Sequence, residues 1–291
     1  MKQILLFLAF LISQLQMQSQ QIDRKLQQKV QQLLTGFQGD AGVYIKSLKT
    51  GKMVEINADT VFPTASMVKV PILLGIMDKI KRKELAYHQP LIYKDSLLYE
   101  GEDILGSFKS NEKIELSKVL MLMLTTSDNT ASLWLQSVAG TGTRINQILD
   151  SLGFAHTKVN SRTPGRETNR SHYGWGQTTP REMATLFEAI YKKQIFGDEA
   201  STKMMRLLSR NYWDEEGLSQ IPPTVEVFSK NGALNASRSE VLLVNAPHHP
   251  YIVCIITKNN KDQSWGESNE AWVLTKKLSA LLWNHFEPKM K

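Results

Sequence analysis

The chain of 291 residues contains one cysteine, Cys254, so no disulfide can form within it. The core must therefore supply the stability of the fold, and a chain of this length can bury a large core as one unit or as two subdomains. The cysteine lies in the run YIVCIIT, which is apolar and rich in β-branched residues. We therefore expect a buried thiol on a strand.

Long apolar runs are also absent, and the longest candidate is the N-terminal stretch MKQILLFLAFLISQLQMQSQQ. Lys2 precedes the run from Ile4 to Ile12, which is too short to span a bilayer comfortably. Polar residues follow, so residues 1–19 are interpreted as an export signal that is cleaved just after Ser19. The protein is then periplasmic or secreted and has no stable membrane span. The alternative is an N-terminal membrane anchor.

Metal and cofactor motifs are missing. None of the six histidines belongs to a His-x-x-x-His pattern or lies near a carboxylate pattern typical of metal sites. The sequence has no glycine-rich phosphate-binding loop. We therefore predict neither a metal nor a cofactor.

A cluster of basic and aromatic residues typical of nucleic-acid modules is missing too. The formal net charge is +7, and it falls to +6 if the signal is removed, because Lys2 is lost and no acid is lost with it. The basic residues are spread along the chain. We expect no nucleic-acid partner, and we expect a monomer.

The order of hydrophobic patterns indicates an α/β chain of the α+β type. A helical stripe over residues 21–34 is followed by two short strands, 43–45 and 53–56. The chain then continues with a long helical block, three strands and a final helix. The expected helices are 66–82, 115–124, 130–138, 143–152, 180–193 and 268–286. The expected strands are 225–229, 239–245 and 251–257. This order predicts a five-stranded antiparallel sheet flanked by the terminal helices, with an inserted all-α subdomain. The proposed boundaries are 20–62 plus 216–291 for the α/β subdomain and 63–215 for the all-α subdomain.

The stretch FPTASMVKVPILLGIMDK combines a buried helix with two polar residues at its start. Ser66 and Lys69 are three residues apart, so on a helix they share one face and the ammonium can reach the hydroxyl. Apolar surroundings lower the pKa of a lysine, which makes an amine base possible near neutral pH. The alternative is structural: Ser66 or Thr64 is a helix cap, and Lys69 extends to water.

Two further polar segments also allow a structural and a functional interpretation. Ser127-Asp128-Asn129 lies between two apolar helices. In the structural interpretation it is a turn in which Asp128 or Asn129 caps the next helix. In the functional interpretation Ser127 supplies a hydroxyl for proton relay, and Asn129 supplies an amide that holds a substrate carbonyl. Lys230-Asn231-Gly232 ends a predicted strand and is either a hairpin turn or one wall of a cleft. In the second case Gly232 allows close approach of the backbone, and the N–H of Ala233 points at a substrate oxygen.

Taken together and in this order, the three segments resemble the motifs of the serine β-lactamases and penicillin-binding proteins, of the class A β-lactamase type. Residues 178–183, TTPREM, resemble the segment that opens the helix after the omega loop of that family. The resemblance covers about residues 25 to 288 and implies a β-lactamase/transpeptidase-like fold.

The resemblance implies acyl transfer through a covalent serine ester on a β-lactam or a peptidoglycan-like peptide. Ser66 would be the nucleophile and Lys69 its base, while Ser127 would protonate the leaving nitrogen under the influence of Lys230. The backbone N–H groups of Ser66 and Ala233 would form the oxyanion hole. Substrate binding is assigned to Asn129, Asn231, Gly232, Ala233 and Arg238. Arg238 lies one residue short of the spacing that is usual in the family. The alternative is that Arg238 is a solvated charge on the strand.

Two departures from the family pattern bear on the activity. Asn231 stands where the family has Thr or Ser. In the omega loop, Pro164 stands where the family has the glutamate that activates water, and Glu167 comes three residues later with Asn169 only two after it. Glu167 is the candidate base, or a solvated carboxylate. The favoured function is a serine β-lactamase, and the alternatives are a D-alanyl-D-alanine carboxypeptidase-like hydrolase and a penicillin-binding sensor that stays acylated.

Overall fold

The computed structural model describes residues 21–99 and 103–288 of the chain. The predicted signal peptide lies outside these residues, and so does the alternative membrane anchor. In the part that is described, no helix is long and apolar enough to cross a bilayer.

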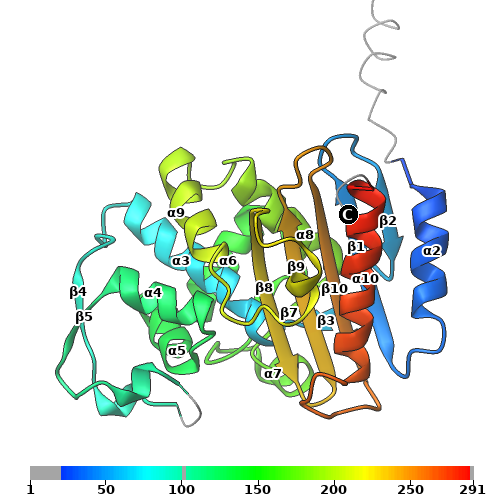
Figure 1. Cartoon of the computed structure of the whole chain (residues 1–291). Helices are drawn as coiled ribbons and strands as arrows, with labels where there is room; N and C mark the ends of the chain where they lie inside the picture. Colours follow the sequence, from blue (N-terminus) through cyan, green and yellow to red (C-terminus); the bar gives the residue numbers. More distant parts are fainter. Residues whose placement is uncertain (1–20, 100–102, 289–291) are drawn as a thin grey trace, which may run out of the picture.

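A five-stranded antiparallel sheet forms one half of the molecule, with the strand order β2-β1-β10-β9-β8 (Figure 1). Aliphatic residues fill its long strands, and every residue of β9 is buried, as expected of a sheet covered on both faces. The predicted sheet is confirmed. Its strands are β1 (Asp40–Ser47), β2 (Met53–Ile56), β8 (Val227–Leu234), β9 (Ser237–Val244) and β10 (Tyr251–Lys258).

Strand β8 extends further than the sequence predicts. It continues through Asn231 and Gly232, which pair with Glu240 and Ser239, and the chain reverses only between Leu234 and Ser237. The prediction that the strand ends at residue 229 is therefore wrong, and so is the hairpin turn at Asn231-Gly232. The local turn tendency of Asn-Gly is overridden because a full ladder of cross-strand pairs with β9 is available.

The terminal helices α2 (Arg24–Leu34) and α10 (Glu270–Phe286) cover one face of the sheet (Figure 1). Their buried residues, including Leu26 and Leu278, join Val43, Leu242 and Val253 of the strands in one apolar cluster. This arrangement agrees with the predicted flanking helices.

The opposite face of the sheet packs on a larger cluster that contains most of the helical block. Val241 and Cys254 belong to the same cluster as Leu73, so the core is continuous between sheet and helices. The division into two subdomains stays a prediction. Cys254 is buried as expected, and burial raises the pKa of its thiol. The helices of this block are α3 (Lys69–Lys81), α4 (Leu116–Thr125), α5 (Asn129–Val138), α6 (Thr141–Ser151), α7 (Glu167–Tyr173), α8 (Pro180–Tyr191) and α9 (Asp198–Leu208).

Short elements connect these parts. Strand β3 (Phe62–Pro63) pairs with β7 (Gly176–Thr178), which pairs with β6 (Lys158–Val159), while β4 (Pro90–Ile92) pairs with β5 (Lys113–Glu115). The 3₁₀ turns are η1 (Ala65–Val68), η2 (Asp95–Leu97), η3 (Leu105–Ser107) and η4 (Gly217–Gln220). Helices α7 and α9 were not predicted individually, because both lie beside irregular segments without a long apolar stripe.

Ser66 lies in the 3₁₀ turn η1 that leads directly into α3. The predicted start of an α-helix at residue 66 is therefore early by three residues. Ala65 adopts the left-handed conformation with φ 46°, which breaks any regular entry to the helix. The body of α3 is buried from Lys69 to Asp78, in agreement with the predicted central helix.

Candidate active site

Lys69 joins the first two motifs in the structure. Its Nζ donates to Ser66 Oγ at 3.2 Å, to Ser127 Oγ at 3.0 Å and to Asn129 Oδ1 at 2.9 Å, and it also donates to the Ser127 carbonyl. The spacing of Ser66 and Lys69 thus brings the two functional atoms together as predicted. One amine contacts both hydroxyl groups, so it can exchange a proton with either of them.

Lys69 is fully buried, and burial lowers the pKa of its ammonium to about 7. The carboxylates of Asp103 and Asp128 oppose this shift because they favour the charged form. A substantial fraction of the side chain is therefore the neutral amine near neutral pH. The alternative in which Lys69 extends to water is wrong, since none of its surface is exposed.

The loop that carries Ser127 is held by two aspartates. Asp128 caps α5 by accepting from Ala131 N at 2.7 Å, and its second oxygen accepts from Leu105 N at 2.8 Å. Asp103 accepts from Asn129 N at 2.9 Å and from Thr130 N at 2.8 Å. Ser127 itself has a left-handed backbone with φ 62°, which is uncommon for serine. The predicted cap at Asp128 and the presentation of Ser127 to the cleft are thus features of the same turn.

Lys230 is the second buried lysine of the site. Its Nζ donates to the carbonyl and to Oδ1 of Asn231, at 2.9 and 3.2 Å. Burial lowers the pKa of Lys230 well below its usual value, and the nearby charge of Lys69 lowers it further, while Glu240 raises it. Two buried lysines within electrostatic range of each other favour the neutral form of both.

Gly232 brings the sheet into contact with the nucleophile. A Cβ atom placed on Gly232 would lie 2.6 Å from Ser66 N and 2.9 Å from Ala65 Cβ, closer than real Cβ atoms come. Glycine is therefore required for this approach. It places Ser66 N beside the strand residue that precedes Ala233, where the predicted oxyanion hole would form.

These residues line a cleft of about 510 Å³ between the helical block and the edge strand β8. Ser66, Ser127, Asn129, Asn231, Gly232 and Ala233 all line it. The sequence analysis missed the rest of the wall, which consists of Asp103, Thr126, Trp213, Glu215, Glu216, Trp265 and Trp272. The aromatic and acidic run NYWDEEG could have indicated part of it.

Glu167 is not among the residues that line the cleft. It is exposed at the start of α7, and its Oε1 accepts from Gly165 N at 3.1 Å. Arg166 and Asn169 bind Gln177 Oε1 at 2.8 and 3.0 Å and so fasten this segment to β7. The arrangement favours the alternative in which Glu167 is a solvated loop carboxylate.

The Glu167→Gln variant should therefore retain turnover of a penicillin within about twofold of the unmodified protein, since Glu167 does not line the cleft. Steady-state kinetics with benzylpenicillin, together with intact-mass spectrometry of the stalled protein, would measure this. A large drop in turnover with accumulation of a stable acyl adduct would show instead that Glu167 moves to the cleft and activates water.

Arg238 also lies outside the cleft lining. Its guanidinium donates to the carbonyls of Ser237 and Ser264 at 2.9 and 2.5 Å and to that of Leu234. Its guanidinium carbon lies over the rings of Trp265 and Trp272, at 4.8 and 5.7 Å from their centroids. Arg238 is 1 % exposed, so it is not a solvated strand charge. Its Nη1 group holds the β8–β9 turn, and its Nη2 group holds the Ser264 carbonyl in the loop before α10.

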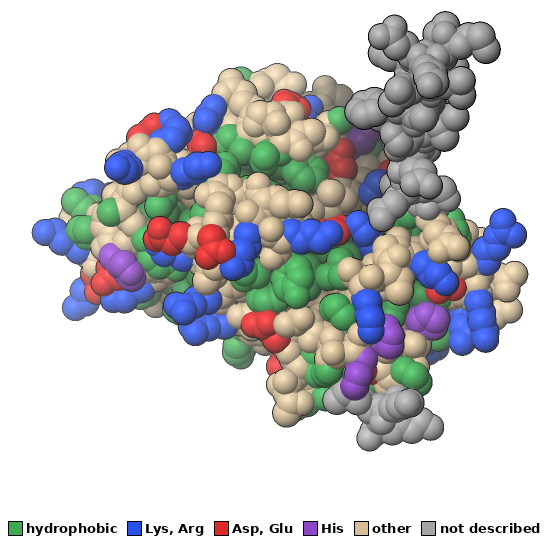
Figure 2. All heavy atoms as spheres, turned by 90° about the horizontal axis from the view of Figure 1, so that it is seen from above, with side chains coloured by type: hydrophobic (Ala, Val, Ile, Leu, Met, Phe, Trp, Pro, Cys, Tyr) green, Lys and Arg blue, Asp and Glu red, His purple; other side chains and the backbone are tan. Residues whose placement is uncertain are grey.

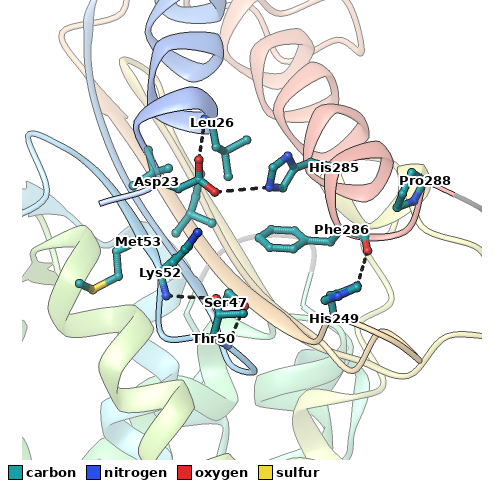
Figure 3. A pocket seen from close by; sticks show the side chains of 12 residues that line it. Asp23, Leu26, Ser47, Thr50, Lys52, Met53, His249, His285, Phe286 and Pro288 are labelled. Atoms are coloured by element: carbon teal, nitrogen blue, oxygen red, sulfur yellow. Dashed lines mark hydrogen bonds and ion pairs between the residues drawn. The ribbon is translucent and has the colours of Figure 1, made fainter. Parts of the chain in front are cut away.

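A second pocket of about 250 Å³ lies between α2, the β1–β2 turn and the end of α10 (Figure 3). Several of its polar side chains are paired with one another or with backbone. Asp23 caps α2 through Leu26 N at 2.9 Å and lies 3.7 Å from His285, and His249 contacts the Phe286 carbonyl at 3.0 Å. The described residues contain no group of histidine, cysteine or acidic side chains that could hold a metal ion.

Basic side chains are distributed over the face shown in Figure 2, with acidic side chains between them. This face therefore presents charges of both signs.

A family model described as the Beta-lactamase enzyme family matches residues 25–286. The chain therefore belongs to this family, and its predicted place in the serine β-lactamase and penicillin-binding superfamily is confirmed.

Among curated relatives, the chain is 22 % identical to beta-lactamase VEB-1 of Pseudomonas aeruginosa, over 98 % of each chain. It is 23 % identical to beta-lactamase BRO-1 of Moraxella catarrhalis, over 84 % of this chain and 80 % of the relative. Among solved structures, it is similar to PBP-A with a TM-score of 0.81 and 23 % identity, over 92 % of this chain and 98 % of that one. It is similar to the TLA-1 extended spectrum beta-lactamase with a TM-score of 0.80 and 15 % identity, over 90 % and 98 %. These structural similarities confirm the predicted fold.

Proposed function

We propose that this protein is a serine β-lactamase that opens the β-lactam amide through an ester on Ser66. The observation that carries the proposal is the position of one buried amine, Lys69, within hydrogen-bonding distance of both Ser66 Oγ and Ser127 Oγ. A nucleophile and its base held in this way are the signature of covalent acyl transfer.

In the acylation step, neutral Lys69 accepts the proton of Ser66 while Oγ forms a bond to the β-lactam carbonyl carbon. The C–N bond then breaks, and Ser127 transfers its proton to the leaving nitrogen and recovers one from Lys69. This relay needs no further base, because the Lys69 nitrogen contacts both hydroxyls. The backbone N–H groups of Ser66 and Ala233 stabilise the oxyanion, and each such donor contributes about 3 kcal/mol to the transition state.

Asn129 and Lys230 complete the acylation machinery. Asn129 Oδ1 is held by Lys69, which orients the amide so that its NH₂ group can bind a substrate carbonyl. Lys230 is held by the carbonyl and Oδ1 of Asn231. In this proposal the N–H dipoles of its amine, or its charge when it is protonated, poise Ser127 for proton transfer. Since the Asn231 oxygen is occupied by Lys230, the Asn231 NH₂ group remains to bind a substrate carboxylate.

Hydrolysis of the ester is the step that separates the alternatives. Of the described carboxylates, those that line the cleft are Asp103, Glu215 and Glu216, and Glu167 is not among them. Asp103 is occupied by the backbone of Asn129 and Thr130. This observation favours slow deacylation, so a penicillin-binding protein that stays acylated, or a D-alanyl-D-alanine carboxypeptidase-like hydrolase, is the second candidate function.

Intact-mass spectrometry during reaction with benzylpenicillin tests the proposal. We expect the mass of one penicillin to be added to the chain and then lost as penicilloate accumulates, and we expect neither event in the Ser66→Ala variant. An adduct that persists without product would favour the second candidate. Folded protein that forms neither adduct nor product would refute acyl transfer at Ser66.

We further propose that the protein is exported and monomeric, with a β-lactam or a peptidoglycan-like peptide as its partner. The support for export is the N-terminal pattern of Lys2 followed by the apolar run from Ile4 to Ile12. N-terminal sequencing of the protein recovered from the cell envelope and light scattering of the purified protein would check both statements.

A further inference from the structure

One wall of the cleft combines aromatic rings with carboxylates. Trp213, Glu215 and Glu216 come from the loop before η4, Trp265 from the loop before α10, and Trp272 from α10 itself. Trp213 and Trp265 are exposed, at 41 % and 64 %, whereas Trp272 is buried. Aromatic faces and carboxylates are the two kinds of group that attract organic cations.

Glu216 is a carboxylate of this wall whose buried Oε2 has no hydrogen-bond partner among the described residues. Its side chain is 10 % exposed, and within the described residues neither carboxylate oxygen accepts a hydrogen bond. The nearest cation is Lys276 Nζ, at 3.9 Å from Oε2. A buried carboxyl without hydrogen bonds is costly, and such groups occur where a ligand completes them.

The surroundings of Glu216 are acidic in balance. The negative charges of Glu215 and Glu267 raise the pKa of Glu216, and Glu240 on β9 interacts with it as well. The positive charges of Arg238 and Lys276 lower this pKa. Burial raises the pKa of Glu216 to about 7 and that of Glu240 to about 8. A further positive charge at this wall would stabilise both carboxylates.

The wall is attached to the segment that carries Ser127. Trp213 Nε1 donates to the Thr126 carbonyl at 3.0 Å, and Tyr212 N donates to the Thr125 carbonyl at 3.0 Å. These bonds attach the wall to the residues just before Ser127, the group that protonates the leaving nitrogen. Asn231, with its free NH₂ group, lines the same cleft.

Arg238 offsets the acidic groups at this end of the cleft only in part. Its Nη1 and Nη2 groups donate to the carbonyls of Ser237, Ser264 and Leu234, Nε has no hydrogen-bond partner among the described residues, and the guanidinium lies near the rings of Trp265 and Trp272. A substrate substituent at the wall therefore meets tryptophan rings and the carboxyl groups of Glu215 and Glu216.

We propose that the wall formed by Trp213, Glu215, Glu216, Trp265 and Trp272 is a subsite for a cationic substituent on the leaving-group side of the substrate. The preferred substrate class is zwitterionic at that end, with a carboxylate toward Asn231 and an ammonium or pyridinium toward Glu216. This inference rests on the proposed acylation of Ser66 and extends it to substrate selection.

Two cephalosporins that share one acyl side chain and differ only at C3 test the subsite. One carries a pyridiniummethyl group and the other an acetoxymethyl group. For each protein the second-order rate constants of Ser66 acylation give a cation preference, the ratio of the two rates. Because acylation defects that affect both substrates cancel in this ratio, we expect Glu216→Gln to lower the preference about tenfold. Glu267→Gln removes the same charge from an exposed position outside the cleft lining and should leave the preference within about twofold.

The preference should also rise between pH 6 and pH 8, because Glu216, with its pKa of about 7, changes from mostly protonated to mostly ionised over that range while the pyridinium charge is constant. Titration of Lys69 changes both acylation rates equally and so does not alter the ratio. A preference that is the same in Glu216→Gln as in the unmodified protein would overturn the subsite.

A binding measurement separates failure of the subsite from failure of the proposed reaction. In the Ser66→Ala variant, quenching of tryptophan fluorescence by benzyltrimethylammonium should exceed quenching by its neutral carbon isostere, and Glu216→Gln added to this variant should remove the difference. Equal binding of the two probes would refute the cation subsite whether or not Ser66 can be acylated. Absence of acylation together with selective binding of the cation would refute the proposed reaction and retain the subsite.

Discussion

Replacing Lys69 with methionine should slow acylation of Ser66 by benzylpenicillin about 10²- to 10⁴-fold, the range that loss of a positioned general base produces. Lys69 is the group that contacts Ser66 Oγ and Ser127 Oγ together, so its loss interrupts both proton transfers of the acylation step. Rapid-quench mass spectrometry of the acyl adduct measures the rate directly.

Two control variants separate the base from the structural roles of Lys69. Lys79→Met makes the same change on the same helix at a partly exposed position and should leave acylation unchanged. Lys69→Arg retains hydrogen-bond donors toward Ser127 and Asn129 but cannot accept a proton near neutral pH. If Lys69→Arg acylates at the normal rate, the amine is a donor that organises the site and is not the base.

The pH profile of the unmodified protein gives an independent check of this role. Burial lowers the pKa of Lys69 to about 7, and the neutral form is the active one. The acylation rate should therefore rise as the pH increases through 7 and level off above about 8. A profile that is flat between pH 5 and 9 would contradict a lysine base with this pKa.

The part of the site that depends on local spacing could be predicted from the sequence. Ser66 and Lys69 lie one turn apart at the entry to an apolar helix, so their spacing alone brings the two polar atoms together once that helix is buried. Ser127 and Asn129 follow the same logic, because a cap at Asp128 fixes the direction of both side chains. In each case the decisive geometry extends over a few residues.

The sequence does not predict the role of a side chain when its contacts come from segments that are distant in the chain. Arg238 has the residue type expected for carboxylate binding, yet the position of Trp265 and Trp272 decides that its donors turn to backbone carbonyls. Glu216 shows no local pattern that indicates a cleft residue, since it reaches the site only because its loop is attached to the end of α4. The spacing along the chain identifies Glu167 as a candidate base, but it does not predict the direction in which the loop points this side chain.

The Lys230-Asn231-Gly232 segment shows why local turn signals are weak beside a sheet. Asn-Gly favours a hairpin turn in isolation. The strand continues here because each residue from Val227 to Leu234 finds a partner on β9, and this pairing satisfies the backbone groups that a turn would leave exposed. Gly232 is needed for its contact with Ser66 and not for a turn.

That contact leads to the second large expected effect. Replacing Gly232 with alanine should slow acylation of Ser66 by about 10²-fold or more, because the new methyl group would lie 2.6 Å from Ser66 N and must displace either the nucleophile or the edge strand. A shift of about 1 Å in a reacting group is enough for a loss of this size. We also expect the free energy of unfolding to fall by about 1–3 kcal/mol, as for other overpacked sites.

Acylation rates from mass spectrometry and urea unfolding curves, measured on the same preparations, separate these two consequences. Gly266→Ala is the matched control, because a Cβ atom there meets nothing within 4 Å and its backbone does not have a positive φ. The control should change neither quantity. The decisive comparison is made well below the unfolding transition, where every Gly232→Ala molecule is folded and a reduced rate reports the position of Ser66 alone. If acylation there matches the unmodified protein, β8 can withdraw from Ser66 without cost, and the close approach of the strand is not what orients the nucleophile.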